Sequence, residues 1–330
     1  MPNHNELSIK TDHLSKHFGH LVAVDSLAIE VKRGEIFGLV GPDGAGKTTT
    51  LRMLATILEP TSGSATVAGL DLHRDAEPIK ARIGYMAQQF TLYGDLTVLE
   101  NITFLADIYG VRGQVRRERI ERLLNFARLT EFVQRRAGLL SGGMKKKLGL
   151  ACAMVHAPDI LFLDEPTTGV DPVSRREFWD ILADLHTTGT TIVVNTPYMD
   201  EAERCSQVGL MYQGRLVEYG SPNQLKALLP GQLLEFKPVV AADAGEETPH
   251  GVGLLHHAQS ILTPLPGVLE VQSMGDLLHV FVDNVAERQP QLAAALAGQH
   301  ISMSGARQIS PRMEDAFISL ITKLETEATP

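Results

Sequence analysis

The stretch GPDGAGKTT, residues 41–49, decides the fold of this chain. Its glycines, lysine and first threonine fit the pattern G-x-x-x-x-G-K-[ST] of a phosphate-binding loop. A short apolar run over 35–40 precedes the stretch and is suited to a buried strand, and apolar residues at helical spacing follow over 49–55. Strand, glycine-rich turn and helix is the context that this motif requires. The residues expected to cradle a nucleotide here are Gly41, Asp43, Gly44, Ala45, Gly46, Lys47, Thr48 and Thr49.

The chemistry of such a loop follows from its backbone. Glycines let the N–H groups curl around an anion, and the N-terminus of the following helix adds partial positive charge. Lys47 is expected to reach the β- and γ-phosphates, and the Thr48 hydroxyl to bind Mg²⁺. The alternative is a chance glycine-rich turn, which the motifs further along the chain make far less plausible.

Length and composition set broad limits. The chain has 330 residues, enough for two domains, with 44% hydrophobic and 21% charged residues. It contains no run of 18 or more apolar residues, and its N-terminus has no apolar core for export, so we expect a chain that does not itself span a membrane. The two cysteines, Cys152 and Cys205, suggest a reducing compartment. The net charge of −9 argues against a broad nucleic-acid surface.

Two stretches have a local interpretation that stays open. Runs over 21–24 and 27–31 indicate an antiparallel sheet, and nearby Phe18 is either an aromatic that stacks on adenine or a surface aromatic of that sheet. Residues 97–140 are apolar at helical spacing, and a helix is expected over 145–156. Between them, Ser141, Gly142 and Gly143 form either an anion-binding helix start or a simple helix cap.

Two buried strands are predicted to end in polar residues. The apolar run over 160–163 ends in Asp164 and Glu165, and a second buried strand covers 191–195. Asp164 is suited to holding Mg²⁺, and Glu165 to polarising the attacking water. Gln88 follows a short strand over 83–86 and is a candidate for binding Mg²⁺ or a water.

The ordered set of motifs over residues 7–225 resembles the ATP-binding subunit of an ABC transporter. That set is GPDGAGKT at 41–48, Gln88, LSGGM at 140–144, ILFLDEP at 160–166 and GVD at 169–171. The resemblance implies ATP with Mg²⁺, a P-loop α/β fold, an antiparallel subdomain and a helical subdomain at about 90–140. Within one subunit, the resemblance implies that Phe18 stacks on adenine, Asp164 binds Mg²⁺ and Glu165 is the catalytic base. Gln88 would link metal and water to the membrane partner. Across the dimer, Ser141 and Gly143 would contact the γ-phosphate bound to the other subunit, and Asp171 would cross the interface.

One position departs from this pattern. Members of the family usually have Thr-His after the strand at 191–195, whereas this chain has Thr196-Pro197. Proline has neither a side-chain donor nor a backbone N–H, so it cannot hold a γ-phosphate. We therefore expect ATP binding with slow turnover, and a pairing with a different ATPase subunit rather than a homodimer. The alternative is that neighbouring residues compensate and hydrolysis continues.

The resemblance also implies partners and a location. We expect a separate membrane permease, a second ATPase subunit or domain, and a position on the cytoplasmic face of the membrane. Two alternatives compete: a soluble ATPase of translation or DNA maintenance, and a regulatory subunit that does not hydrolyse ATP. Against the first, only about fifty residues separate Gln88 from Ser141, without a heptad array.

Residues 226–330 are expected to form a small α+β accessory domain, with the ATP-binding domain covering 1–225. Strands are predicted over 233–236, 268–271, 277–282 and 301–309, helices over 286–298 and from Pro311 onward, and a loop over 241–253, in ferredoxin-like order. The segment 312–318 resembles the tail of the exporter-type (ABC-2) subfamily, notably multidrug efflux ATPases. No chemistry is predicted there. Surface positions are expected for His4, His13, His17, His20, His256 and His257.

Overall fold

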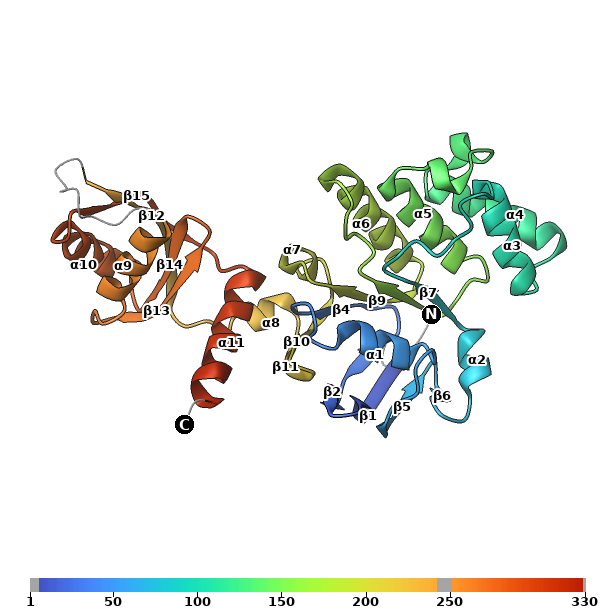
Figure 1. Ribbon diagram of the computed structural model, residues 1–330, viewed down its shortest axis with the longest axis horizontal. Coiled ribbons are helices and arrows are strands. Elements are labelled where there is room, and N and C mark those ends of the chain that lie inside the picture. The colour runs from blue at the N-terminus through green and yellow to red at the C-terminus, as the bar shows by residue number, and fades with distance from the viewer. Residues whose placement is uncertain (1–5, 242–250, 329–330) are drawn as a thin grey trace. The chain divides into compact units, whose positions relative to one another are not determined.

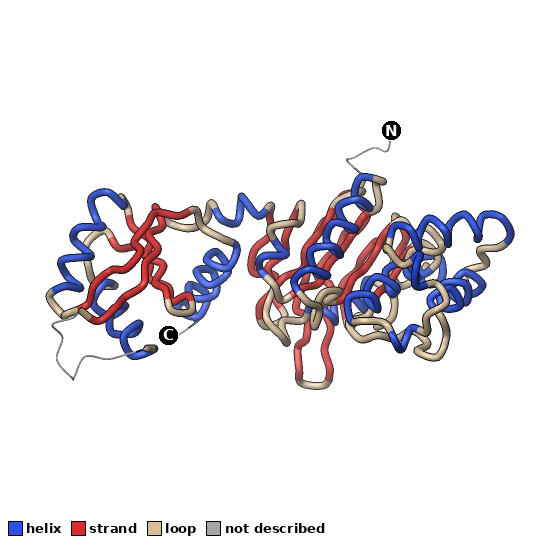
Figure 2. Tube along the Cα trace, turned by 90° about the horizontal axis from the view of Figure 1, so that it is seen from above, coloured by secondary structure: helices blue, strands red, loops and turns tan. Residues whose placement is uncertain are grey.

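The computed structural model describes residues 6–241 and 251–328, and the chain divides into two compact units, Met1–Pro222 and Asn223–Pro330. Figure 1 labels their helices and strands, and Figure 2 shows the same elements by type. Most of the loop predicted over 241–253 lies outside the described residues, as does His4. The predicted α/β fold class is confirmed, and each unit is described below by itself.

A six-stranded sheet forms the centre of the first unit, in the order β11-β10-β4-β9-β8-β7. Its strands are parallel except β11, which forms a hairpin with β10. The central strands β4, β8 and β9 are buried along their whole length, as their apolar composition predicts. The strands are β4 (Ile36–Val40), β7 (Ile83–Met86), β8 (Ile160–Asp164), β9 (Thr191–Thr196), β10 (Gln207–Tyr212) and β11 (Arg215–Gly220).

The register of these strands brings the predicted motifs together. Val40, the last residue before the phosphate loop, pairs with Thr196, and Asp164 pairs with Asn195. Because parallel strands have their carboxyl ends at the same edge, the ends of β4, β8 and β9 lie side by side.

A second, antiparallel sheet packs on the helix that follows the phosphate loop. Helix α1 (Lys47–Leu54) contacts β2 of this sheet and β8 and β9 of the central sheet. The prediction missed the long first strand. The strands are β1 (Leu7–Phe18), β2 (Leu21–Leu27), β3 (Glu30–Lys32), β5 (Ser62–Val67) and β6 (Leu70–Asp71).

The helical subdomain lies between β7 and β8 in the sequence, as predicted. Its first helix, α3, begins with a capping box in which Thr97 and Glu100 bond each other's backbone N–H groups. The expected helix at 145 begins at Gly142, because Ser141 caps it. The helical elements of this unit and of the unit boundary are α2 (Ala76–Lys80), α3 (Val98–Ile108), α4 (Gly113–Phe126), the 3₁₀ turns at Thr130–Phe132 and Ala137–Leu139, α5 (Gly142–Ala153), α6 (Pro172–Thr187), α7 (Met199–Ala202) and α8 (Pro222–Lys226).

The second unit has the element order β-α-β-β-α-β followed by a helix, with the sheet order β13-β14-β12-β15. This is the ferredoxin-like order that was expected, but the prediction missed its first helix, α9. The elements are β12 (Gln232–Val240), α9 (Val252–Leu262), β13 (Val268–Met274), β14 (Leu277–Val282), α10 (Val285–Ala297), β15 (Ile301–Ile309) and α11 (Met313–Ala328).

The two faces of this sheet differ in chemistry. Helices α9 and α10 pack on the face that carries Leu234, Phe236 and Val280, whereas α11 contacts β13 on the other face (Figure 1). On the α11 face a buried ion cluster replaces part of the apolar core. His279 bonds Asp315 of α11 through Nδ1 at 2.5 Å and Glu235 of β12 through Nε2 at 3.1 Å.

Two opposing effects act on the pKa of His279. Burial lowers it, but the hydrogen bonds and charges of Asp315 and Glu235 outweigh burial, so the pKa lies above the ordinary 6.5. Arg307 of β15 donates two hydrogen bonds to Glu235 and, as the largest cause, lowers the pKa of that carboxyl below 4.5.

This cluster predicts a pH optimum for the stability of the second unit. Because the pKa of His279 is raised, the charged histidine stabilises the folded unit fully below pH 6.5. This stabilisation is lost as the pH rises through the raised pKa. Because the pKa of Glu235 is lowered, its carboxylate stabilises the folded unit fully above pH 4.5. This stabilisation is lost as the pH falls through the lowered pKa. We expect protection of β14 amides in the full chain, measured by hydrogen exchange, to be greatest between these two values.

The control is His279→Gln, which removes the cation beside the buried Asp315 carboxylate and leaves Glu235 its bonds from Arg307, and it is expected to destabilise the unit by about 3–5 kcal/mol. Lys237→Gln removes an exposed ion pair with Asp276 on the same sheet and is expected to cost about 1 kcal/mol or less. An unchanged pH profile in His279→Gln would show that the histidine is not responsible.

Candidate functional site

The phosphate loop and the first antiparallel strands enclose one cavity of about 270 Å³. Phe18, half exposed at the end of β1, lies in its wall, although the sequence alone left its role open. Glu165 reaches the same cavity from the end of β8. Nine of the predicted nucleotide or catalytic residues therefore line one hollow: Phe18, Asp43, Gly44, Ala45, Gly46, Lys47, Thr48, Thr49 and Glu165.

Gly46 is the residue that the loop geometry demands. It caps α1 with φ of +99°, which L side chains rarely adopt. A Cβ at this position would lie 2.3 Å from the carbonyl oxygen of Ala23 in β2. The close approach of loop and antiparallel sheet therefore depends on the missing side chain.

Lys47 is buried at the start of α1, where its Nζ donates to the carbonyl oxygens of Gly41 and Pro42, at 2.8 Å each. Burial lowers its pKa, and the charges of Glu165, Asp43 and Asp164 only partly oppose this. An anion in the loop would favour the charged ammonium, so the lysine is suited to a phosphate.

Thr48 and Asp164 form the predicted metal site. The Thr48 hydroxyl donates to Asp164 Oδ1 at 2.8 Å, and Tyr85 donates to Oδ2 at 3.2 Å. A hydroxyl and a carboxylate oxygen are hard ligands of the kind that Mg²⁺ takes when phosphates supply the remaining positions. The residues present fit this ion. Among the described residues, no three His, Cys, Asp or Glu side chains group as ligands, so the pair is not part of a larger all-protein cage.

Glu165 is buried and held by its neighbours. Its Oε2 accepts hydrogen bonds from Gln88 Nε2 at 2.7 Å and from Thr168 Oγ1 at 3.0 Å. Its φ of +45° is unusual for a residue with a side chain and costs roughly 1–2 kcal/mol. Gln88 was predicted as a metal ligand and as a catalytic residue, and here its side chain lies on Glu165. Its role at the metal stays a prediction.

Lys146 links α5 to this centre through contacts that no sequence pattern predicted. Its Nζ donates to the carbonyl oxygens of Gln88 at 2.6 Å and Glu165 at 3.2 Å. The lysine therefore ties the helix that begins at the LSGGM motif to Glu165 in the cavity and to Gln88, which holds Glu165.

The remaining predicted residues lie away from the cavity. Ser141 caps α5 by accepting from Met144 N, and Asp171 caps α6 by accepting from Val173 and Ser174. Gly143 is packed so closely that a Cβ would lie 2.6 Å from the Ser174 side chain. Ser141, Gly142 and Asp171 are exposed, so they are free to meet another molecule.

Pro197 follows β9 at the edge where the phosphate loop begins, since Thr196 pairs with Val40. The neighbouring polar groups bond one another: Glu201 accepts from Thr167 at 2.6 Å and from Thr196 at 2.7 Å. Asn195, in turn, bonds Thr48 and Asp164, a contact that no local sequence pattern predicted.

Comparison with known proteins agrees with this geometry. The family described as "ABC transporter" matches residues 24–168. The chain is 47% identical over 222 residues to "Probable multidrug ABC transporter ATP-binding protein YbhF" of Escherichia coli (strain K12), an alignment that covers 67% of this chain and 38% of that protein. It thus spans well under half the length of this relative. It is 33% identical to "Daunorubicin resistance ATP-binding protein DrrA2" of Streptomyces coeruleorubidus, over 98% of this chain and 97% of that protein.

Among solved structures, an ATP-binding cassette in a dimeric, post-hydrolysis state bound to ADP and Pi is similar, with a TM-score of 0.59 and 25% identity. The match covers 64% of this chain and 98% of that one. The predicted cassette fold is confirmed by this likeness.

The geometry of the loop predicts that Gly46→Ala distorts it. The added Cβ meets a backbone carbonyl that has no room to move, so we expect loss of nucleotide binding and a destabilisation of about 3 kcal/mol or more. Gly19→Ala is the control, because its φ is also positive but nothing lies within 4 Å, and it is expected to cost about 1 kcal/mol. Thermal melting and binding of a fluorescent ATP analogue measure both effects. Equal losses in the two variants would contradict the close packing described here.

Proposed function

This chain belongs to the ATP-binding proteins of ABC transporters, a family of ATPases, and from that premise we propose that it powers export through a separate membrane permease. The single observation that carries the proposal is the shared cavity of Phe18, the phosphate loop and Glu165. An adenine-stacking aromatic, a phosphate cradle and a base stand around one hollow, as ATP hydrolysis requires. A relative named "Nod factor export ATP-binding protein I", of Paraburkholderia xenovorans (strain LB400) and 42% identical over 67% of this chain, supports the direction of transport.

The residues of the cavity divide the work. The loop from Gly41 to Thr49 binds the phosphates through its N–H groups and Lys47, and Phe18 stacks on the base. Thr48 and Asp164 hold Mg²⁺, which neutralises phosphate charge when bound. Glu165 orients the attacking water and takes its proton. In the structure Gln88 and Thr168 both donate to the Oε2 atom of that carboxylate and so fix its orientation.

We propose that the complete site forms between two cassettes. Ser141, Gly142 and Asp171 are exposed at helix starts and line no part of the chain's own cavity. Their free N–H groups and hydroxyl suit the γ-phosphate bound to a second subunit. The dimeric state of the solved cassette supports this arrangement. The partner is a second copy or a different ATPase.

Pro197 is proposed to slow turnover at the chain's own site. It lies beside the start of the phosphate loop but offers no hydrogen-bond donor. Loss of one transition-state donor costs a factor of about 100 or more in rate. The intact signature at 140–144 would still serve the nucleotide of a partner, which favours pairing with a different ATPase.

Mg²⁺-dependent ATP hydrolysis by the purified chain tests this proposal, beside Pro197→His and with Glu165→Gln as the blank. We expect wild type to lie near the blank and the histidine variant to turn over about 100-fold faster. A wild-type rate as high as that of the histidine variant would show that Pro197 is tolerated and that a homodimer suffices. ATP binding without hydrolysis by any variant would show that turnover needs the permease or a second ATPase.

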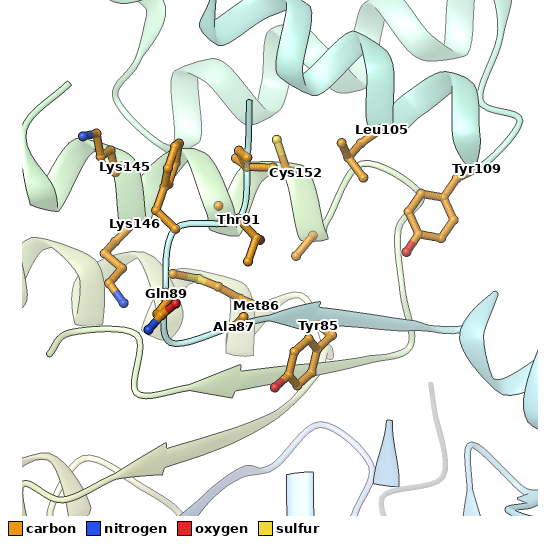
Figure 3. A pocket seen from close by; sticks show the side chains of 14 residues that line it. Tyr85, Met86, Ala87, Gln89, Thr91, Leu105, Tyr109, Lys145, Lys146 and Cys152 are labelled. Carbon is orange, nitrogen blue, oxygen red and sulfur yellow. The ribbon is translucent and has the colours of Figure 1, made fainter. Parts of the chain in front are cut away.

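The surface proposed to meet the permease is the groove in Figure 3. It holds about 130 Å³ between the segment after β7, α3 and α5. Phe90, Leu92 and Leu105 contribute apolar surface, while Lys145 and Lys146 stand at one side. Phe90 and Tyr109 are exposed although aromatic, which suits an apolar helix of a partner.

The groove lies next to the residue that holds the catalytic glutamate. Gln88 lies next to Gln89 and Phe90 in the segment that forms its wall, and Lys146 bonds the Gln88 carbonyl. A partner seated here would therefore move with the residue that holds Glu165. No helix in the described part of the chain is both long and apolar enough to cross a membrane. We propose a peripheral position on the cytoplasmic face of the cell membrane.

Removing the aromatic wall is expected to detach the chain from its permease. Phe90→Ser with Tyr109→Ser should lower the affinity of the chain for membranes that contain the permease by about tenfold or more, since loss of even one buried aromatic hot spot costs about 2 kcal/mol at an interface. Basal ATP binding should stay unchanged, because neither side chain lines the nucleotide cavity. Val115→Ser is the control, an exposed apolar residue of α4 outside the groove. Membrane binding that survives the double variant would place the docking surface elsewhere.

A further inference from the structure

Asn195 occupies the point where the three catalytic strands meet. Its Nδ2 donates to Asp164 Oδ1 at 2.5 Å and to Thr48 Oγ1 at 3.1 Å. Its backbone carbonyl accepts from Glu165 N at 2.9 Å. One residue of β9 therefore touches the metal-binding threonine, the metal-binding aspartate and the backbone of the catalytic glutamate.

The side chain of Asn195 is fully buried, and its second polar atom has no partner. The nitrogen must face Asp164, because a carboxylate only accepts hydrogen bonds. The Oδ1 atom then points elsewhere, is buried, and accepts no hydrogen bond from the described residues. Leaving a buried amide oxygen unsatisfied costs about 1–3 kcal/mol. An apolar side chain would fill this strand position at no such cost, so packing alone does not explain the asparagine.

We propose that Asn195 is a positioning residue of the Mg²⁺ site: its amide nitrogen holds the Asp164 carboxylate and the Thr48 hydroxyl together. The inference rests on the proposed function, because it presumes that Mg²⁺ binds at Thr48 and Asp164. Second partners of metal ligands of this kind commonly set affinity by 10–100-fold.

The position of Asn195 also bears on Pro197, two residues further on. Pro197 gives no donor at this edge of the sheet, whereas the Asn195 amide donates hydrogen bonds to Thr48 and Asp164. The chain has therefore kept a side-chain donor at the end of β9, aimed at the metal ligands. This would preserve nucleotide binding where turnover is slow.

The experiment compares affinities with and without the metal in the full-length chain. Binding of a non-hydrolysable ATP analogue is measured by calorimetry in excess Mg²⁺ and in EDTA, for wild type, Asn195→Ala and Asn195→Ser. In both variants the gain in affinity that Mg²⁺ provides should fall about tenfold, while affinity in EDTA changes less than about twofold. Mn²⁺ binding in the presence of the analogue, followed by electron paramagnetic resonance, should weaken by the same factor.

Asn195→Asp keeps the shape but sets a second carboxylate against Asp164. Its melting temperature should fall in EDTA, because two carboxylates this close repel each other, and should recover with Mg²⁺ and the analogue. A purely structural asparagine predicts an equal loss in both conditions. Asn101→Ala is the matched control, since Asn101 is equally buried and donates to the carbonyl oxygens of Tyr93 and Thr97 in the helical subdomain. It should lower the melting temperature and leave the Mg²⁺ gain unchanged.

The outcomes separate this inference from the proposed function. If wild type shows a Mg²⁺ gain and the Asn195 variants keep it, the positioning role is wrong and the ATPase proposal stands. If the variants lose affinity equally in Mg²⁺ and in EDTA, the residue is only structural. If wild type binds the analogue without any help from Mg²⁺, both proposals fall.

Discussion

The hydrogen bonds among Thr48, Asp164 and Asn195 are the interaction on which the cassette depends. They join the phosphate loop to β8 and β9, and they exist only because Asp164 pairs with Asn195 and Val40 with Thr196. A slip of one residue in either pair would turn every side chain to the other face of the sheet. The same register that buries the apolar strands therefore assembles the polar groups, and stability and chemistry share one constraint.

A second set of contacts joins Glu165 to the groove and to the helix that begins at the signature. Glu165 is held in a left-handed backbone conformation, with Gln88 and Thr168 on its carboxylate and Lys146 on its carbonyl oxygen. Lys146 belongs to α5, the helix that begins at the signature, and Gln88 belongs to the segment that lines the groove. A change at the groove or at the signature thus has a short, hydrogen-bonded route to the base. Such a change would release the backbone strain at Glu165.

In the second unit, the two faces of a small sheet are covered in different ways. Helices α9 and α10 bury one face by apolar packing, whereas α11 is held on the other by His279, Glu235, Asp315 and Arg307. A buried ion cluster contributes less than apolar packing of the same volume, but it demands a particular partner at each position. It therefore fixes where α11 sits, and it makes that face sensitive to pH.

The sequence by itself determined the family, the phosphate loop and the strand ends at Asp164 and Glu165, because adjacent residues or short periodic patterns carry these features. It also showed the loss of a donor at Pro197. It missed β1, whose buried residues do not alternate, and α9, although Leu254, Leu255, Ala258 and Leu262 stand at helical spacing. Only the tertiary structure decided that Asn195 meets Thr48 across 147 positions, that Lys146 reaches Glu165, and that His279 joins Asp315. Such contacts join residues from separate elements. The residues around a polar side chain in an apolar run do not reveal its partner, because strand register decides which residue lies beside it.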